Sequence, residues 1–151
     1  MIPSQVAAQS DTYLLQRIQG ASPEQLCVLL LEGAQKFLLQ TIQATKARNI
    51  SDKAKFVNRV SAIIEELTVQ LNHDEENELV MNLNRIYEWW MSQLFEASRN
   101  NEPEKFEMIY NQIDSIKGTW EELIRRNQAA PQVAQATVAA APRGLGEELI
   151  G

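Results

Sequence analysis

The sequence predicts an all-α protein folded as an antiparallel up-down four-helix bundle. Apolar residues recur every three or four positions through four long segments, and helix-start signals precede those segments. The connections between the segments are short and polar, which favours antiparallel neighbours, and no segment alternates in the manner of a strand. We divide the 151 residues into an N-terminal cap segment (1–21), the bundle (22–127) and a disordered tail (128–151).

The first helix is expected to begin near residue 23. Ser22 is a favourable N-cap, and Pro23 suits the first helical position, where no amide hydrogen is needed. Gln25 is placed to complete a capping box with Ser22. Apolar residues then follow two adjacent faces of one helix as far as about residue 48.

The second helix is expected to follow a break at Asn49 and Ile50, with Ser51 as its N-cap. Its apolar residues between Phe56 and Leu71 form a single stripe, which the core of a bundle accounts for. The polar residues 72–77 then read as a connection.

The third helix is expected to begin near Leu79, and the fourth to follow a second start signal at 100–104. Asn101 is the expected N-cap of the fourth helix, with Glu104 placed to reach back to it. Gly118 lies inside the fourth helix, where glycine costs roughly 1 kcal/mol relative to alanine. The chain beyond residue 127 is rich in Ala, Gln and Pro and lacks periodicity, so we interpret it as a disordered tail.

Composition argues against several classes of function. The formal net charge of −6 and the scattered basic residues disfavour a nucleic-acid partner. His73 is the single histidine, so the paired Glu-x-x-His motifs of a di-iron site cannot be formed and a Ser-His-Asp triad would depend on this one residue. We therefore expect no catalytic site, no bound metal and no cofactor. Cys27 shares its helical phase with core leucines, so we expect a buried thiol. No signal peptide or membrane span is evident, and we expect a cytoplasmic protein without membrane insertion.

The third helix carries more apolar surface than a bundle core requires. Its apolar side chains cover about 240° of the helical wheel, whereas one stripe slightly wider than 100° would suffice. Excess of this kind usually marks an interaction site, here a groove for an apolar peptide helix. Trp89 is a candidate contact residue because, on the helical wheel, it lies at the edge of the apolar stripe, beside Asn82 and Gln93. The alternatives are that the chain's own ends cover the surface, or that a homodimer or a larger structural assembly does.

Several motifs, in matching order and spacing, make residues 13 to about 127 resemble the FliS family of flagellin export chaperones. The matching pieces are Tyr13, Ile18, Ala21–Leu26, Leu31–Ala34, Phe37–Leu38, Ile63–Leu67, Asn82–Leu83, Tyr87 and Trp120. The resemblance implies a four-helix chaperone, not an enzyme, that binds the disordered C-terminal segment of flagellin and blocks premature polymerisation before export.

The resemblance also implies where the client would bind. The N-terminal segment, through Tyr13, Leu14 and Ile18, would cap part of the groove and give way to the client. On the third helix, the expected client-contact residues are Leu79, Asn82, Leu83, Ile86, Tyr87 and Trp89. Further partners left open are the flagellar export gate, an anti-sigma regulator and a co-chaperone.

Overall fold

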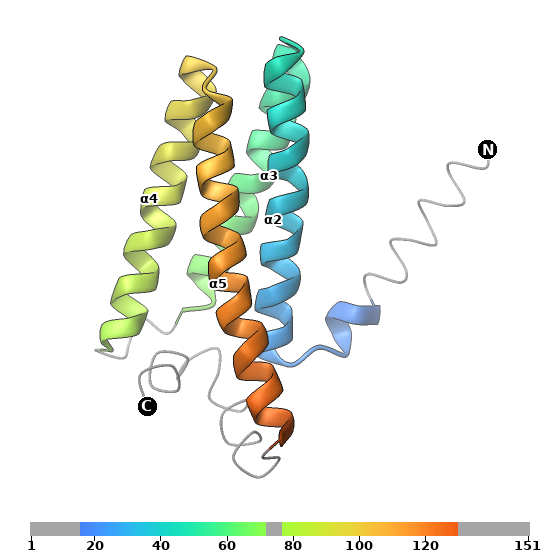
Figure 1. The fold of residues 1–151 in the computed structure, drawn as a ribbon, viewed down its shortest axis with the longest axis vertical. Coiled ribbons are helices and arrows are strands. Elements are labelled where there is room, and N and C mark those ends of the chain that lie inside the picture. Colours follow the sequence, from blue (N-terminus) through green and yellow to red (C-terminus); the bar gives the residue numbers. More distant parts are fainter. Residues whose placement is uncertain (1–15, 72–76, 130–151) are drawn as a thin grey trace, which may run out of the picture.

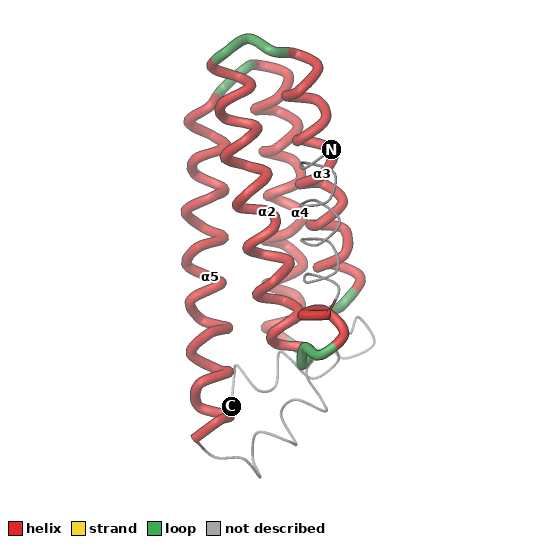
Figure 2. The backbone as a smooth tube through the Cα atoms, turned by 90° about the vertical axis from the view of Figure 1, so that its right-hand side faces the viewer, coloured by secondary structure: helices red, strands yellow, loops and turns green. Residues whose placement is uncertain are grey.

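The computed structural model describes residues 16–71 and 77–129, and this part of the chain is helical apart from short turns. Four long helices run side by side in an up-down arrangement (Figures 1 and 2). They are α2 (Pro23–Lys46), α3 (Ile50–Val69), α4 (Glu78–Asn100) and α5 (Pro103–Ala129). The predicted all-α four-helix bundle is therefore confirmed. The expectations for residues 1–15 and for the tail beyond residue 129 lie outside the described residues.

The helices form a ring in which each one packs against two neighbours. Helix α2 lies against α3 and α5, and α4 closes the ring by contacting the same two helices. The turns from α2 to α3 and from α4 to α5 lie at the upper end of the bundle in Figure 1. A helical turn over residues 16–19 precedes α2.

The start of α2 follows the sequence prediction. The Ser22 hydroxyl accepts a hydrogen bond from the Gln25 amide (3.2 Å), and the Gln25 side chain accepts one from the Ser22 amide (2.9 Å). Both halves of the capping box are thus present, with Pro23 at the first helical position. The signal is local in sequence, which is why it could be read without tertiary information.

Two other predicted N-caps are wrong. Helix α3 begins at Ile50, and its cap is Asn49, whose side chain accepts a hydrogen bond from the amide of Asp52 at 3.0 Å. Ser51 therefore lies inside the first turn of α3. Asn101 ends α4 instead of starting α5, because it adopts a left-handed conformation with φ of 53°. Asparagine tolerates that conformation better than most residues, and it is common just past a helix end.

The core is drawn from all four long helices. Its largest fully buried side chains are aromatic: Tyr87, Trp90, Phe106 and Trp120. Polar links join the helices around it. The Gln35 amide on α2 donates to the Asp114 carboxylate on α5 at 3.1 Å. The ammonium group of the buried Lys53 on α3 donates to the Ser98 carbonyl oxygen at the end of α4, at 2.7 Å.

Helix α4 is held less closely than the other three. The backbone of α2 approaches α3 and α5 over much of its length, and a Cβ built on Gly33 would lie 3.3 Å from the Cδ1 atom of Ile63. The backbone of α4 approaches its neighbours in fewer places. Bulky side chains such as Trp90 fill the space between α4 and the rest of the bundle. The helix with the broadest apolar arc is thus also the one whose backbone makes the fewest close approaches to its neighbours.

Candidate functional site

Large apolar side chains are exposed on α4. Met81, Trp89 and Phe95 are 49%, 40% and 43% exposed, whereas a helix that only serves a core shows solvent a polar face. Elsewhere in the described residues, exposed large apolar side chains lie singly on other elements: Ile18, Leu39, Ile50 and Val69. The excess apolar surface predicted for the third helix is therefore present on α4.

Four of the predicted client-contact residues form a continuous stripe along α4. Leu79, Asn82, Ile86 and Trp89 follow one another at intervals of three and four residues, which places them on one side of the helix. We call this set the Trp89 stripe. Asn82 and Trp89 are exposed, while Leu79 and Ile86 are half-buried and pack against the core.

The Trp89 stripe lies on the side of α4 that faces α5. Glu96 is seven residues beyond Trp89 and so lies on the same side of the helix. Its carboxylate pairs with the Lys105 ammonium on α5 at 3.2 Å. Phe95 lies on the opposite flank, because a step of six residues rotates a side chain by about 240° around the helix. The two aromatic side chains therefore belong to different flanks of the same exposed face.

Two of the predicted contact residues are not accessible in this structure. Leu83 is 5% exposed and Tyr87 is 1% exposed, and both belong to the core. The Tyr87 ring packs against the Trp90 ring, with 5.4 Å between centroids. A broad apolar arc does not reveal which part of it faces the core. Leu83 and Tyr87 lie on the side of α4 that faces the core, where they pack behind the exposed residues.

The predicted cap residues are only partly within the described chain. Ile18 lies in the helical turn before α2 and is 39% exposed. Tyr13 and Leu14 lie outside the described residues. Met81 and Phe95, which the sequence-based site omitted, are exposed on α4 as well. Membership of the broad apolar arc was the available signal for Phe95, but the arc alone does not distinguish exposed from buried positions. Met81 lies outside that arc.

Groups suited to covalent or metal chemistry do not gather in the described part of the chain. Within residues 16–71 and 77–129, no three His, Cys, Asp or Glu side chains are placed to hold a metal ion together. Burial, with a smaller contribution from the charge of Glu24, raises the pKa of the Cys27 thiol to about 12. Cys27 is therefore a neutral, buried thiol at physiological pH, as its helical phase predicts.

None of the helices described here is long and apolar enough to cross a membrane. The fold and the exposed side chains define the class: an antiparallel helical bundle with an apolar surface on one helix, a feature that usually marks an interaction site. The model of the family described as Flagellar protein FliS matches residues 5–128. The chain belongs to the FliS family.

Curated relatives share the family and carry a more specific name. The flagellar secretion chaperone FliS of Vibrio cholerae is 25% identical over 107 residues, which are 71% of this chain and 79% of the relative. FliSB of Pseudomonas aeruginosa is 27% identical over 105 residues, covering 70% and 83%. FliS of Salmonella typhimurium is 22% identical over 121 residues, covering 80% and 90%. Membership of a family of secretion chaperones implies a client protein.

Proposed function

We propose that this protein is a cytoplasmic export chaperone for flagellin. In this proposal it binds the disordered C-terminal segment of flagellin, prevents premature polymerisation, and helps deliver the client to the flagellar export apparatus. The bundle surface covers the client segment sterically, and no catalytic step is involved. The observation that carries the proposal is the partly exposed Trp89 stripe on α4 in a member of the FliS family.

The Trp89 stripe is suited to an amphipathic client helix. A helix laid along a groove presents anchors at intervals of three, four and seven residues, and the stripe on α4 has the same periodicity. Trp89 offers a large, rigid surface of which 40% is still accessible. Residues of this type dominate the energy of many interfaces because they bury a large area with few rotatable bonds.

The burial pattern of α4 divides the predicted contact residues into two sets. In the proposal the client contacts Leu79, Asn82, Ile86 and Trp89 directly, while Leu83 and Tyr87 hold α4 in place from the core. Competition by the N-terminal segment, through Tyr13, Leu14 and Ile18, remains a prediction.

The test is calorimetric titration of the full chain with a peptide of the flagellin C-terminus, repeated with Trp89→Ala and Phe95→Ala. Phe95 is the matched control, since it is an aromatic residue of similar exposure on the other flank of α4. We expect one-to-one binding with a negative heat-capacity change. Trp89→Ala should weaken binding at least about tenfold, whereas Phe95→Ala should leave it within about threefold.

Stability measurements separate a binding defect from misfolding. Both substitutions remove partly exposed side chains, so each should lower the free energy of unfolding by no more than roughly 1 to 2 kcal/mol. Absence of binding to the unsubstituted protein at high micromolar peptide would contradict the proposal. A molecular mass that rises with protein concentration, with no client present, would favour the alternative in which the α4 surface makes a homo-oligomer.

A further inference from the structure

The side-chain amide of Gln112 on α5 is fixed in orientation by α4. Its Oε1 atom accepts a 2.7 Å hydrogen bond from the indole of the buried Trp90. The oxygen and the nitrogen lie on opposite sides of the planar amide group, so the Nε2 atom points away from the indole. Within residues 16–71 and 77–129, no oxygen accepts a hydrogen bond from this Nε2 atom, and the half-buried Gln112 leaves it accessible to solvent. Gln112 therefore presents two N–H donors that the described bundle does not use.

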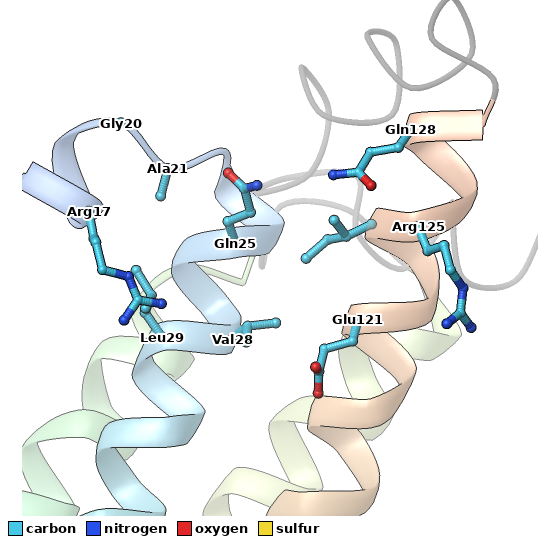
Figure 3. A pocket seen from close by; sticks show the side chains of 10 residues that line it. Arg17, Gly20, Ala21, Gln25, Val28, Leu29, Glu121, Arg125 and Gln128 are labelled. Carbon is cyan, nitrogen blue, oxygen red and sulfur yellow. The ribbon is translucent and has the colours of Figure 1, made fainter.

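These donors lie on the side of α5 that faces α4. The opposite side of α5 faces α2, and in Figure 3 Glu121 points from that side into the cleft between α2 and α5. Gln112 and Glu121 are nine residues apart, which is two and a half helical turns, so their side chains leave α5 on opposite sides. Gln112 thus belongs to the boundary between α4 and α5, away from that cleft.

The Gln112 amide is level with Trp89 along the bundle axis. The ion pair of Glu96 with Lys105 and the hydrogen bond of Trp90 to Gln112 fix the register of the two antiparallel helices. Trp89 is next to Trp90 in the chain, and the Trp89 stripe lies on the side of α4 that faces α5. The accessible Trp89 ring and the unused donors of Gln112 are therefore neighbours across the boundary between the two helices.

Helix α5 adds apolar side chains of its own to this boundary. Ile116 and Leu123 lie four and eleven residues beyond Gln112, a spacing that keeps all three on one side of the helix. Both are half-buried and pack against the core, as Leu79 and Ile86 do on α4. We call this surface the α4–α5 seam, which consists of Leu79, Ile86, Trp89, Gln112, Ile116 and Leu123. It is an apolar surface with one fixed pair of donors.

An uncharged oxygen suits these donors better than a carboxylate. Glu96 and Glu102 share the ammonium group of Lys105, at 3.2 and 3.4 Å, so two carboxylates face one cation beside the seam. The remaining negative charge disfavours a client carboxylate there. The backbone carbonyl groups inside a client helix are already bonded within that helix. The remaining uncharged acceptor is the side-chain oxygen of an asparagine or a glutamine.

We propose that Gln112 determines client specificity by donating from Nε2 to the side-chain carbonyl oxygen of an Asn or Gln on the client helix. The inference rests on the proposed function, because it requires the client helix to lie on the α4–α5 seam. Many amphipathic helices could cover the apolar part of the seam. A helix with an aliphatic residue opposite Gln112 would bury the donors without an acceptor, and the site rejects such a helix for that reason.

Amide NMR of the full chain during titration with the peptide of the flagellin C-terminus tests the contact. We expect the Gln112 side-chain amide signals to move downfield as the peptide saturates its site. Asn111 is the internal reference, since it is exposed and its side chain leaves α5 about 100° away from that of Gln112. Saturable binding that leaves the Gln112 signals in place would overturn this inference and leave the proposed function standing. No binding at all would overturn both.

Two matched variants measure the contribution of the donors. Gln112→Glu keeps an acceptor for the Trp90 indole but replaces the donors with an oxygen, and Asn111→Asp makes the same chemical change at the neighbouring position. We expect Gln112→Glu to weaken peptide binding about tenfold or more and Asn111→Asp to change it by less than about twofold. Urea unfolding shows whether each variant keeps the parent stability. Equal affinities in two stably folded variants would overturn the proposal.

A series of peptides identifies the acceptor. Each asparagine of the peptide is replaced singly by leucine, and each glutamine by methionine, because these residues keep the shape without the amide. One replacement should weaken binding to the parent protein about tenfold and leave binding to Gln112→Glu nearly unchanged, since that variant has already lost the bond. If no replacement behaves in this way, the donors do not meet a client side-chain amide and the proposal is wrong.

Discussion

The indole Nε1 of Trp90 donates a 2.7 Å hydrogen bond to the Oε1 atom of Gln112, and this bond links α4 to α5. The Trp90 side chain is fully buried, so its N–H group cannot donate a hydrogen bond to solvent instead. Trp90 also contacts Tyr87, one turn earlier on α4. The bond therefore fixes the rotation of α4 about its own axis, and with it the direction in which the adjacent Trp89 faces.

Replacing Gln112 with Leu should destabilise the bundle by about 1 to 3 kcal/mol. The substitution leaves a buried N–H donor without an acceptor, and the cost is the desolvation of that group. Gln112→Glu is the control, because it keeps an acceptor oxygen at the same position. Urea unfolding followed by circular dichroism measures both. If the Leu variant unfolds at the same urea concentration as the parent, the indole has found another acceptor and Gln112 does not orient α4.

Gly118→Ala should stabilise the protein by about 0.5 to 1 kcal/mol. Gly118 lies in the interior of α5 without a positive φ, and nothing lies within 4 Å of a Cβ built there. Alanine therefore gains helix propensity and loses unfolded-state entropy without a clash. Gly33→Ala is the comparison, because its Cβ would lie 3.3 Å from Ile63 and the gain should be reduced or lost. Thermal unfolding should show a higher midpoint for Gly118→Ala; a lower one would contradict the open space around it.

The fold could be predicted because its signals are repeated and local. Apolar periodicity runs through all four long helices, and the capping box of Ser22 and Gln25 lies within four residues of sequence. The wrong N-cap at Ser51 arose where two capping residues lie close together. Asn49 and Ser51 are both good caps, and the choice depends on the turn, in which Arg48 takes a φ of 57°. That conformation is not visible in the residue types.

The candidate site could be predicted only in outline. The helical wheel identifies α4 as carrying excess apolar surface, but a 240° arc is compatible with several rotations of the helix about its axis. The rotation is fixed by long-range contacts such as Trp90 with Gln112, and these place Leu83 and Tyr87 inside. Trp89 was expected at the edge of the stripe, and it is 40% exposed.

Lys53→Met should destabilise the upper end of the bundle by about 1 to 3 kcal/mol. The Lys53 ammonium group donates to the carbonyl oxygen of Ser98 and to the Oδ1 atom of Asn101, each at 2.7 Å. A cation at a helix C-terminus stabilises the exposed carbonyl groups there, and methionine keeps the length of the side chain without the charge. Hydrogen exchange should quicken at the end of α4. Lys55 is an exposed lysine on the same helix, and its ammonium group lies 5.3 Å from the centre of the Phe56 ring. Lys55→Met should therefore change stability by no more than about 0.5 kcal/mol and leave exchange at the end of α4 unchanged.

The buried Cys27 and Tyr87 predict loss of stability at alkaline pH. Burial raises the Cys27 pKa from 9.0 to about 12, and it also raises the Tyr87 pKa above its ordinary value of 10.0. Both groups ionise more readily in the unfolded chain, so that above pH 9 the unfolded state binds fewer protons than the folded state. The stability that the neutral, buried Cys27 and Tyr87 side chains contribute is therefore fully present below pH 9. It declines as the pH rises toward 12, by up to about 1.4 kcal/mol per pH unit for each group.

Substitution separates the two groups. Cys27→Ala removes the first ionisation, so its free energy of unfolding should fall less than that of the parent between pH 8.5 and 10. Tyr87→Phe should act mainly above pH 10, because the unfolded tyrosine has its ordinary pKa there. Urea unfolding at a series of pH values measures both slopes. A parent slope that neither substitution reduces would show that other groups drive alkaline unfolding, and that the Cys27 thiol reaches water in the folded bundle.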